Sequence, residues 1–168
     1  ALWLIKMEDE LVYVGDEAVV ESSGKTLRKG IEAGIRWQPI SWFSLNFETS
    51  CTIAKSADEP ETLNYIPLAS KWTTMGSLNF KNIRNFSASL RYRQLGDRPA
   101  NEDYSITAKG YQLLDGNINY KYKNINFGFV VENIFNTKWN EAQFATLSRL
   151  KTETESTEEI HFTPGTPI

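Results

Sequence analysis

The stretch WFSLNFETSCTIAK at residues 42–55 alternates apolar and polar side chains more regularly than any other part of the sequence. Phe43, Leu45 and Phe47 have one parity, whereas Ser44 and Glu48 have the other. Successive side chains of a β-strand point to opposite faces, so this pattern predicts a strand with one apolar and one polar face. Strands of soluble proteins peak near 5–6 residues, whereas a tilted strand needs about 9–11 residues to cross a bilayer. The stretch is long enough to cross a membrane.

Six further segments show the same two-residue period, at residues 2–13, 27–37, 71–81, 86–95 and 112–122 and from residue 125 onward. The first of them places Trp3, Ile5 and Met7 on one face. The last meets Asn133–Asn136, where a bulge or kink is expected. No amphipathic helical stretch separates the segments. The sequence therefore predicts an all-β fold, an antiparallel up-and-down sheet of about seven long strands.

The predicted connections alternate between very short and long. Short ones fall near residues 38–41, 81–84 and 121–124, and long polar ones near 15–25, 56–67, 96–109 and 146–166. Outer-membrane barrels show this asymmetry, because one rim carries periplasmic turns and the other carries extracellular loops. Aromatic side chains also form two bands near the strand ends, which suits a lipid headgroup region: Trp37, Trp42, Phe80, Phe86, Tyr120 and Tyr122 in one, Tyr13, Trp72 and Tyr92 in the other. The pattern is typical of a segment of a transmembrane β-barrel.

Composition excludes several other classes. The chain has 168 residues, a net charge of −3 and no Lys/Arg tract, so nucleic acid is not an expected partner. It has no run of about 18 apolar residues that would form a helical span. Cys51 is the only cysteine and His161 the only histidine, and the acidic groups at 9–10, 16–17 and 153–159 lack calcium-loop spacing. We expect no metal site, no cofactor and no enzymatic activity.

Several motifs, taken in order, resemble the carboxy-terminal part of the barrel of TonB-dependent outer-membrane receptors. The two most specific are VENIFN at residues 131–136 and HFTPGTP at 161–167. Weaker ones are EDELVYVGD at 8–16, GKTLRKGIE at 24–32, NYIPLA at 64–69, RYR at 91–93 and YQLLD at 111–115. The resemblance covers essentially the whole of residues 1–168.

Membership of this family implies part of a 22-stranded barrel in a Gram-negative outer membrane. Such receptors enclose a plug domain and import scarce nutrients, for example ferric siderophores, with energy delivered through TonB. The seven segments would correspond to the fifteenth to twenty-first strands. The plug, the TonB-contacting segment, the other barrel strands and the last strand are then expected in a longer parent chain, because seven strands cannot close a bacterial single-chain barrel. The expected partners are outer-membrane lipid, the plug and remaining strands, TonB through the parent chain, and the nutrient ligand.

In each predicted strand, the residues that alternate with the apolar ones share a second, polar face. The charged residues on this face are candidates for lining the lumen of the barrel, where they would contact the plug and the permeating solute. Arginine suits this role because its guanidinium forms bidentate hydrogen bonds with carboxylates. Alternatively, these charged residues form ordinary cross-strand ion pairs on a solvent-exposed face. The candidates are Arg28, Glu32, Arg36, Glu48, Arg91, Arg93, Asp115 and Glu132.

Two other architectures remain open from sequence alone. A soluble secreted β-sandwich could use its aromatic side chains to bind a ligand such as a carbohydrate, and it would have two packed sheets. A small passive membrane barrel would be complete and would contain an even number of strands.

Overall fold

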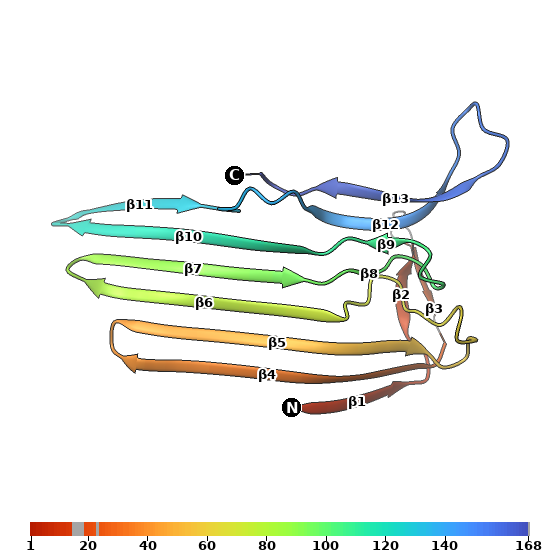
Figure 1. Cartoon of the computed structure of the whole chain (residues 1–168), viewed down its shortest axis with the longest axis horizontal. Coiled ribbons are helices and arrows are strands. Elements are labelled where there is room, and N and C mark those ends of the chain that lie inside the picture. The colour runs from red at the N-terminus through yellow and green to blue at the C-terminus, as the bar shows by residue number, and fades with distance from the viewer. Residues whose placement is uncertain (15–18, 23, 168) are drawn as a thin grey trace.

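The computed structural model describes residues 1–14, 19–22 and 24–167, which form strands and connections (Figure 1). Among these residues, no helix is long and apolar enough to cross a membrane. Seven strands form one antiparallel sheet. Their order is β1 (Leu2–Met7), β4 (Thr26–Ile40), β5 (Phe43–Ser56), β6 (Trp72–Ile83), β7 (Phe86–Leu95), β10 (Tyr111–Tyr122) and β11 (Ile125–Val131).

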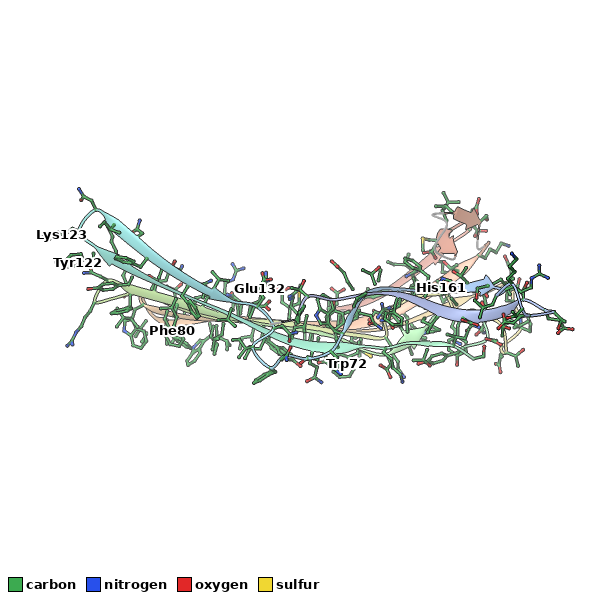
Figure 2. The ribbon with its side chains drawn as sticks, turned by 90° about the horizontal axis from the view of Figure 1, so that it is seen from above. Trp72, Phe80, Tyr122, Lys123, Glu132 and His161 are labelled. Carbon is green, nitrogen blue, oxygen red and sulfur yellow. The ribbon has the colours of Figure 1, made fainter. Side chains whose placement is uncertain are left out.

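The sheet confirms the predicted fold class. From β4 onward each long strand pairs with the next long strand along the chain, which is up-and-down topology. Seen from its edge, the sheet is a single curved layer (Figure 2). It is open, with β1 and β11 at its two edges. The sandwich interpretation is wrong for the described residues, because a sandwich needs two sheets packed face to face. The small-barrel alternative also fails, since the sheet is neither closed nor even in strand number.

The three short connections lie together at one end of the sheet, on the left of Figure 1. Each is a two-residue turn, at Ser41-Trp42, Arg84-Asn85 and Lys123-Asn124, as the cross-strand pairs around them show. Arg84 and Asn85 both have positive φ angles, of 49° and 74°. Positive φ at both central residues defines the type I′ turn, whose twist matches that of the strands it joins. The turns begin up to three residues later than the sequence predicted.

The opposite end carries the long connections, and three small sheets lie there. They are the hairpins β2 (Leu11–Val14) with β3 (Val19–Ser22), β8 (Arg98–Pro99) with β9 (Thr107–Ala108), and β12 (Asn140–Ser148) with β13 (Thr157–Pro164). A small core forms among them from Ala100, Ala108 and Ala145, with Leu68, Ile106 and Ile160 packed around it. The Gln143 side chain joins β12 to the end of β9, because its amide both donates to and accepts from the backbone of Lys109.

Two predicted segments were wrong in extent. Residues 2–13 do not form one strand: β1 ends at Met7, and the chain turns before β2 pairs with β3 instead of with the main sheet. Glu10 explains the break, because its carboxylate turns to the side chains of Thr26 and Arg28. Residues 146–166, expected to be a loop, contain β13 and the end of β12. The predicted connection 15–25 lies partly outside the described residues, as do Asp16 and Glu17.

The strand register gives the sheet two distinct faces. On the polar face, Glu48 lies between Gly34 and Met75, and Arg91 lies between Ser77 and Asp115. Phe47, Ile53, Leu90 and Phe129 project from the other, apolar face, and each is at least 37% exposed. Large apolar side chains with no protein covering are what a lipid-facing wall requires.

The first strand departs from this segregation. Trp3 pairs with Gly30, so Trp3, Ile5 and Met7 share the polar face with Arg28. Gly30 is required there, since a β-carbon at this position would lie 2.5 Å from the indole of Trp3. Alternation within residues 2–7 therefore predicted the strand but did not show which face is polar.

Aromatic side chains gather at the short-turn end of the apolar face. The ring centroids of Phe43 and Phe80 are 5.3 Å apart, and those of Phe86 and Tyr120 are 4.4 Å apart in a stacked arrangement. Trp37 meets Phe43 edge-on at 6.2 Å. These contacts give the band that the sequence predicted, at the level where amphipathic rings meet lipid headgroups.

Candidate functional site on the polar face

The candidate lumen-lining residues lie on one face of the sheet. The cross-strand pairs place Arg28, Glu32 and Arg36 on β4, Glu48 on β5, Arg91 and Arg93 on β7, and Asp115 on β10, all on the polar face. Glu132 follows the end of β11 and is exposed. The alternation of side chains along each strand therefore placed these residues on one face. Of the eight, only Arg91, Arg93 and Asp115 contact one another.

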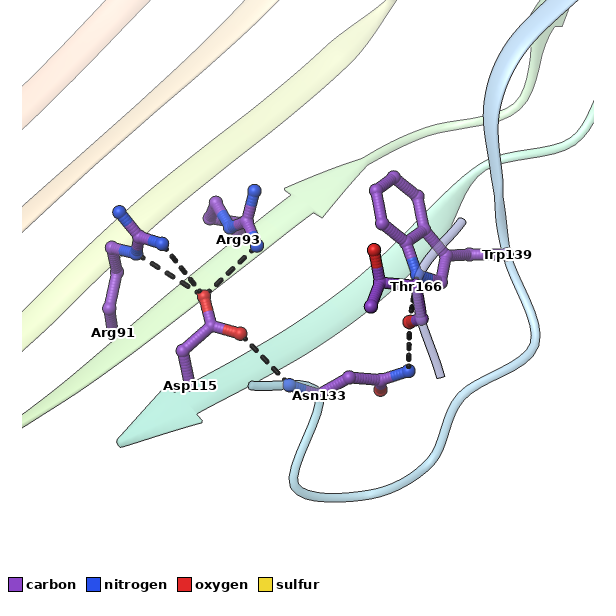
Figure 3. Close-up of polar contacts among 6 residues, drawn as sticks. All are labelled: Arg91, Arg93, Asp115, Asn133, Trp139 and Thr166. Carbon is purple, nitrogen blue, oxygen red and sulfur yellow. Dashed lines mark hydrogen bonds and ion pairs between the residues drawn. The ribbon is translucent and has the colours of Figure 1, made fainter. Parts of the chain in front are cut away.

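That contact is an ion-pair cluster centred on Asp115 (Figure 3). One carboxylate oxygen accepts from Nη2 of Arg91 and from Nη2 of Arg93, each at 3.0 Å. The other oxygen accepts from the backbone N–H of Asn133 at 3.0 Å. The Asp115 side chain is 9% exposed, whereas those of Arg93 and Arg91 are 33% and 58% exposed. A buried carboxylate thus holds two arginines that still present guanidinium edges on the polar face.

Asn133 extends this cluster and was missed as a site residue. It has a φ of 51°, and its backbone turns away from the ladder just after β11. Its side-chain amide donates to the carbonyl oxygens of Thr137 and Thr166, at 2.9 and 3.2 Å. The indole of Trp139 donates to the same Thr166 carbonyl at 3.1 Å. The VENIFN motif therefore ties the end of β11 both to Asp115 and to the segment after β13.

A second ion pair lies at the edge of the sheet. Both carboxylate oxygens of Glu10 accept from Arg28, and one also accepts from the Thr26 hydroxyl. These side chains are mostly buried, at 13% exposure for Glu10 and 25% for Arg28. From the sequence, the acidic residues at 9–10 were noted only for lacking calcium-loop spacing, and the pairing of Glu10 with Arg28 was not predicted. The spacing of the acidic residues in the sequence did not indicate that the chain would turn back over β4.

The centre of the polar face is a shallow hollow of about 710 Å³. Glu32, Glu48 and Arg93 line it, together with Ser50 and Thr73. Glu48 and Arg93 are both cross-strand neighbours of Met75, so they lie two strands apart, about 10 Å at the usual strand spacing. The remaining candidate, Arg36, donates to the side-chain oxygen of Asn46 at 3.0 Å. The hollow thus presents both signs of charge and hydroxyl groups, which suits contact with a polar surface.

One buried cation lies among the long connections. Arg98 is 7% exposed, and its Nη1 has no hydrogen-bond partner within the described part of the chain. Burial lowers the pKa of this guanidinium, while nearby Tyr111 and Asp97 act in the opposite direction. Across residues 1–14, 19–22 and 24–167, no group of three or more His, Cys, Asp or Glu side chains could hold a metal ion.

Comparison with known protein families gives a match over most of the chain. Residues 1–134 match the family described as TonB dependent receptor-like, beta-barrel. The chain belongs to this TonB-dependent receptor family. The match covers the whole of the seven-stranded sheet and ends within the Asn133 turn. A search of curated proteins found no match for this receptor segment.

Three solved structures of bacterial receptors share the fold of residues 1–168. The ferric-catecholate import receptor Fiu from E. coli K12 has a TM-score of 0.71 and 16% identity, covering 99% of this chain and 23% of its own. PiuA from Acinetobacter baumannii has a TM-score of 0.69, 9% identity, and coverage of 99% and 24%. The ferric yersiniabactin receptor FyuA from Yersinia pestis has a TM-score of 0.66, 15% identity, and coverage of 85% and 23%.

The receptor segment thus spans about a quarter of the length of the receptors it resembles. An open sheet is consistent with a segment of about a quarter of a receptor, since such a segment forms only part of a barrel wall. Family membership places the segment in a Gram-negative outer membrane. The family and these neighbours are transport receptors, not enzymes.

Proposed function

We propose that residues 1–168 are the carboxy-terminal part of the barrel of a receptor that imports a scarce nutrient, such as a ferric siderophore, with energy supplied through TonB. The observation that carries this proposal is a family match combined with a two-faced sheet. One face is bare and apolar, and the other holds a charged hollow. Of the three structural neighbours, FyuA takes up ferric yersiniabactin, Fiu imports ferric catecholates and PiuA is a siderophore receptor, which supports iron as the cargo.

In this proposal the polar face lines the lumen. The Arg91–Asp115–Arg93 cluster and the hollow with Glu32 and Glu48 then meet the plug domain or the passing solute. Guanidinium groups that are already oriented by Asp115 bind a carboxylate or an anionic ligand at a lower entropic cost than free arginines would. The long connections face outward and present a binding surface, and the short turns face the periplasm.

Uptake of radiolabelled iron tests this proposal directly. The complete receptor is produced in a Gram-negative host that lacks its own siderophore receptors and is offered a panel of ferric siderophores. We expect uptake with at least one of them, and its loss when the host also lacks TonB. The double variant R91Q/R93Q should lower uptake, whereas K123N, a change in the exposed short turn between β10 and β11 and away from the long connections, should leave it unchanged. Uptake that persists without TonB would contradict energy coupling.

A further inference from the structure

The apolar face contains a groove in addition to its aromatic band. The groove has a volume of about 280 Å³ and is lined by Phe80, Ala88, Leu90, Gly116, Ile118 and Phe129. Cross-strand pairs explain its shape: Ala88 lies between Phe80 and Ile118, and Gly116 pairs with Leu90. Two small residues between larger ones leave a notch in the wall. A β-carbon on Gly116 would lie 3.2 Å from the Leu90 side chain, so any larger residue there would close the groove.

The nearby short turns carry an unbalanced positive charge. Residues 38–47, 77–90 and 117–131 surround the turns and contain Lys81, Arg84, Lys121 and Lys123 but no Asp or Glu. All four cations are exposed, and none forms an ion pair within the described residues. Lys81 and Lys121 have the parity of the polar face, whereas Arg84 and Lys123 lie in the turns themselves and are the two cations closest to the lipid-facing side. A protein whose net charge is −3 therefore concentrates uncompensated cations at one end.

The groove and the cations are adjacent. The backbone N–H of Lys121 donates to the carbonyl of Asn85 at 3.0 Å, which joins the turn containing Arg84 to the strand end that precedes Lys123. Ala88 follows Arg84 by four positions, about 13 Å along a strand, a distance that an extended acyl chain spans. Between them lies the stacked pair of Phe86 and Tyr120, at headgroup level.

We infer that this groove and the basic turns bind one anionic phospholipid of the inner leaflet, with its phosphate at the turns and an acyl chain in the groove. Charge complementarity selects the occupant: a cluster of lysine and arginine at a membrane surface favours anionic over zwitterionic headgroups. The inference goes beyond nutrient import, and it rests on the proposed function only in placing the short turns on the periplasmic side.

The test measures lipid retained by the complete purified receptor, by native mass spectrometry from micelles doped with phosphatidylglycerol or phosphatidylcholine of identical chains. The wild type should retain phosphatidylglycerol preferentially. The double variant R84N/K123N removes two charges where φ is 49° and 50°, a backbone conformation that asparagine tolerates well. It should lower the preference roughly tenfold or more. K71N, at the opposite end of the sheet, is the matched control and should change nothing.

A second variant tests the groove independently of charge. A88I fills the notch, and A33I places the same bulk on the apolar face of β4, outside the groove. A88I should reduce retention of both lipids, whereas A33I should match the wild type. Equal retention by A88I and A33I, an unchanged preference in R84N/K123N, or preferential retention of lipopolysaccharide would overturn the inference. Lipid retention requires neither nutrient nor TonB, so its failure is distinguishable from a failure of iron uptake.

Discussion

Replacing Asp115 by alanine should destabilise the barrel wall, because three donors lose their shared acceptor. The Arg91 side chain is more than half exposed, so its ion pair with Asp115 should contribute at most about 1 kcal/mol. The Arg93 hydrogen bond, which is less exposed, should contribute about 1–2 kcal/mol. Asn133 is 3% exposed, and leaving its N–H without a partner should cost about 1–3 kcal/mol. Since these terms overlap, we expect a loss of about 3 kcal/mol in the free energy of unfolding.

The assay is urea unfolding of the complete receptor in lipid vesicles, followed by tryptophan fluorescence. D115N retains a carbonyl oxygen that can still accept from Asn133, so it should lose about half as much as D115A. The matched control is E48Q, because Glu48 lies on the same face, is exposed and forms no ion pair in the described part of the chain. E48Q should change stability by less than about 0.5 kcal/mol. A D115A receptor that unfolds at the same urea concentration as E48Q would refute the reasoning.

Three further outcomes are expected. F47R places a charge on the apolar face and should cost about 2–4 kcal/mol in vesicles, whereas E48R on the polar face should cost little; equal tolerance would reverse the face assignment. An epitope inserted at Glu59 in the long β5–β6 connection should be stained on intact cells, and staining only after the envelope is broken would invert the orientation. G110A should lower stability by about 1–3 kcal/mol, because its β-carbon would clash with the backbone of Leu95. G34A serves as its control in the same unfolding measurement, since the atom nearest to its β-carbon would be a flexible Glu48 side-chain carbon at 3.5 Å.

Alternation in the sequence was sufficient to predict the main sheet and its two faces. Residues 42–55 form β5 almost as predicted, and Phe47 and Glu48 project from opposite faces. The period of two is fixed by strand geometry, so it survives wherever a strand is paired on both sides. In the edge strand β1, alternation did not identify the polar face. Trp3 packs over Gly30 on that face, and only the register with β4 reveals this.

The long-connection end could not be predicted, because tertiary contacts determine its structure. Gln143 lies between Ala142 and Phe144, beyond the last predicted strand, yet it is 2% exposed and satisfies the backbone of Lys109. Glu10 lies in an acidic run, yet it is paired with Arg28, which follows it by 18 positions. The polarity of these two side chains alone indicates that each should be exposed to solvent. The sequence could predict that Arg91, Arg93 and Asp115 share a face, because they alternate with apolar residues. The hydrogen bond from the Asn133 backbone to Asp115 could not be predicted, because it depends on the positive φ angle of Asn133.

A nitroxide scan along β5 tests the central claim that this sheet is the wall of an outer-membrane barrel. Single labels are placed in turn at positions 44 to 49 of the complete receptor in vesicles, and their collisions with oxygen and with a water-soluble nickel chelate are measured. We predict that collisions with oxygen dominate at positions 45, 47 and 49 and are weaker at 44, 46 and 48. This two-residue period follows from lipid on one face and a lumen on the other. Uniform accessibility of all six positions to the nickel chelate would contradict a membrane wall.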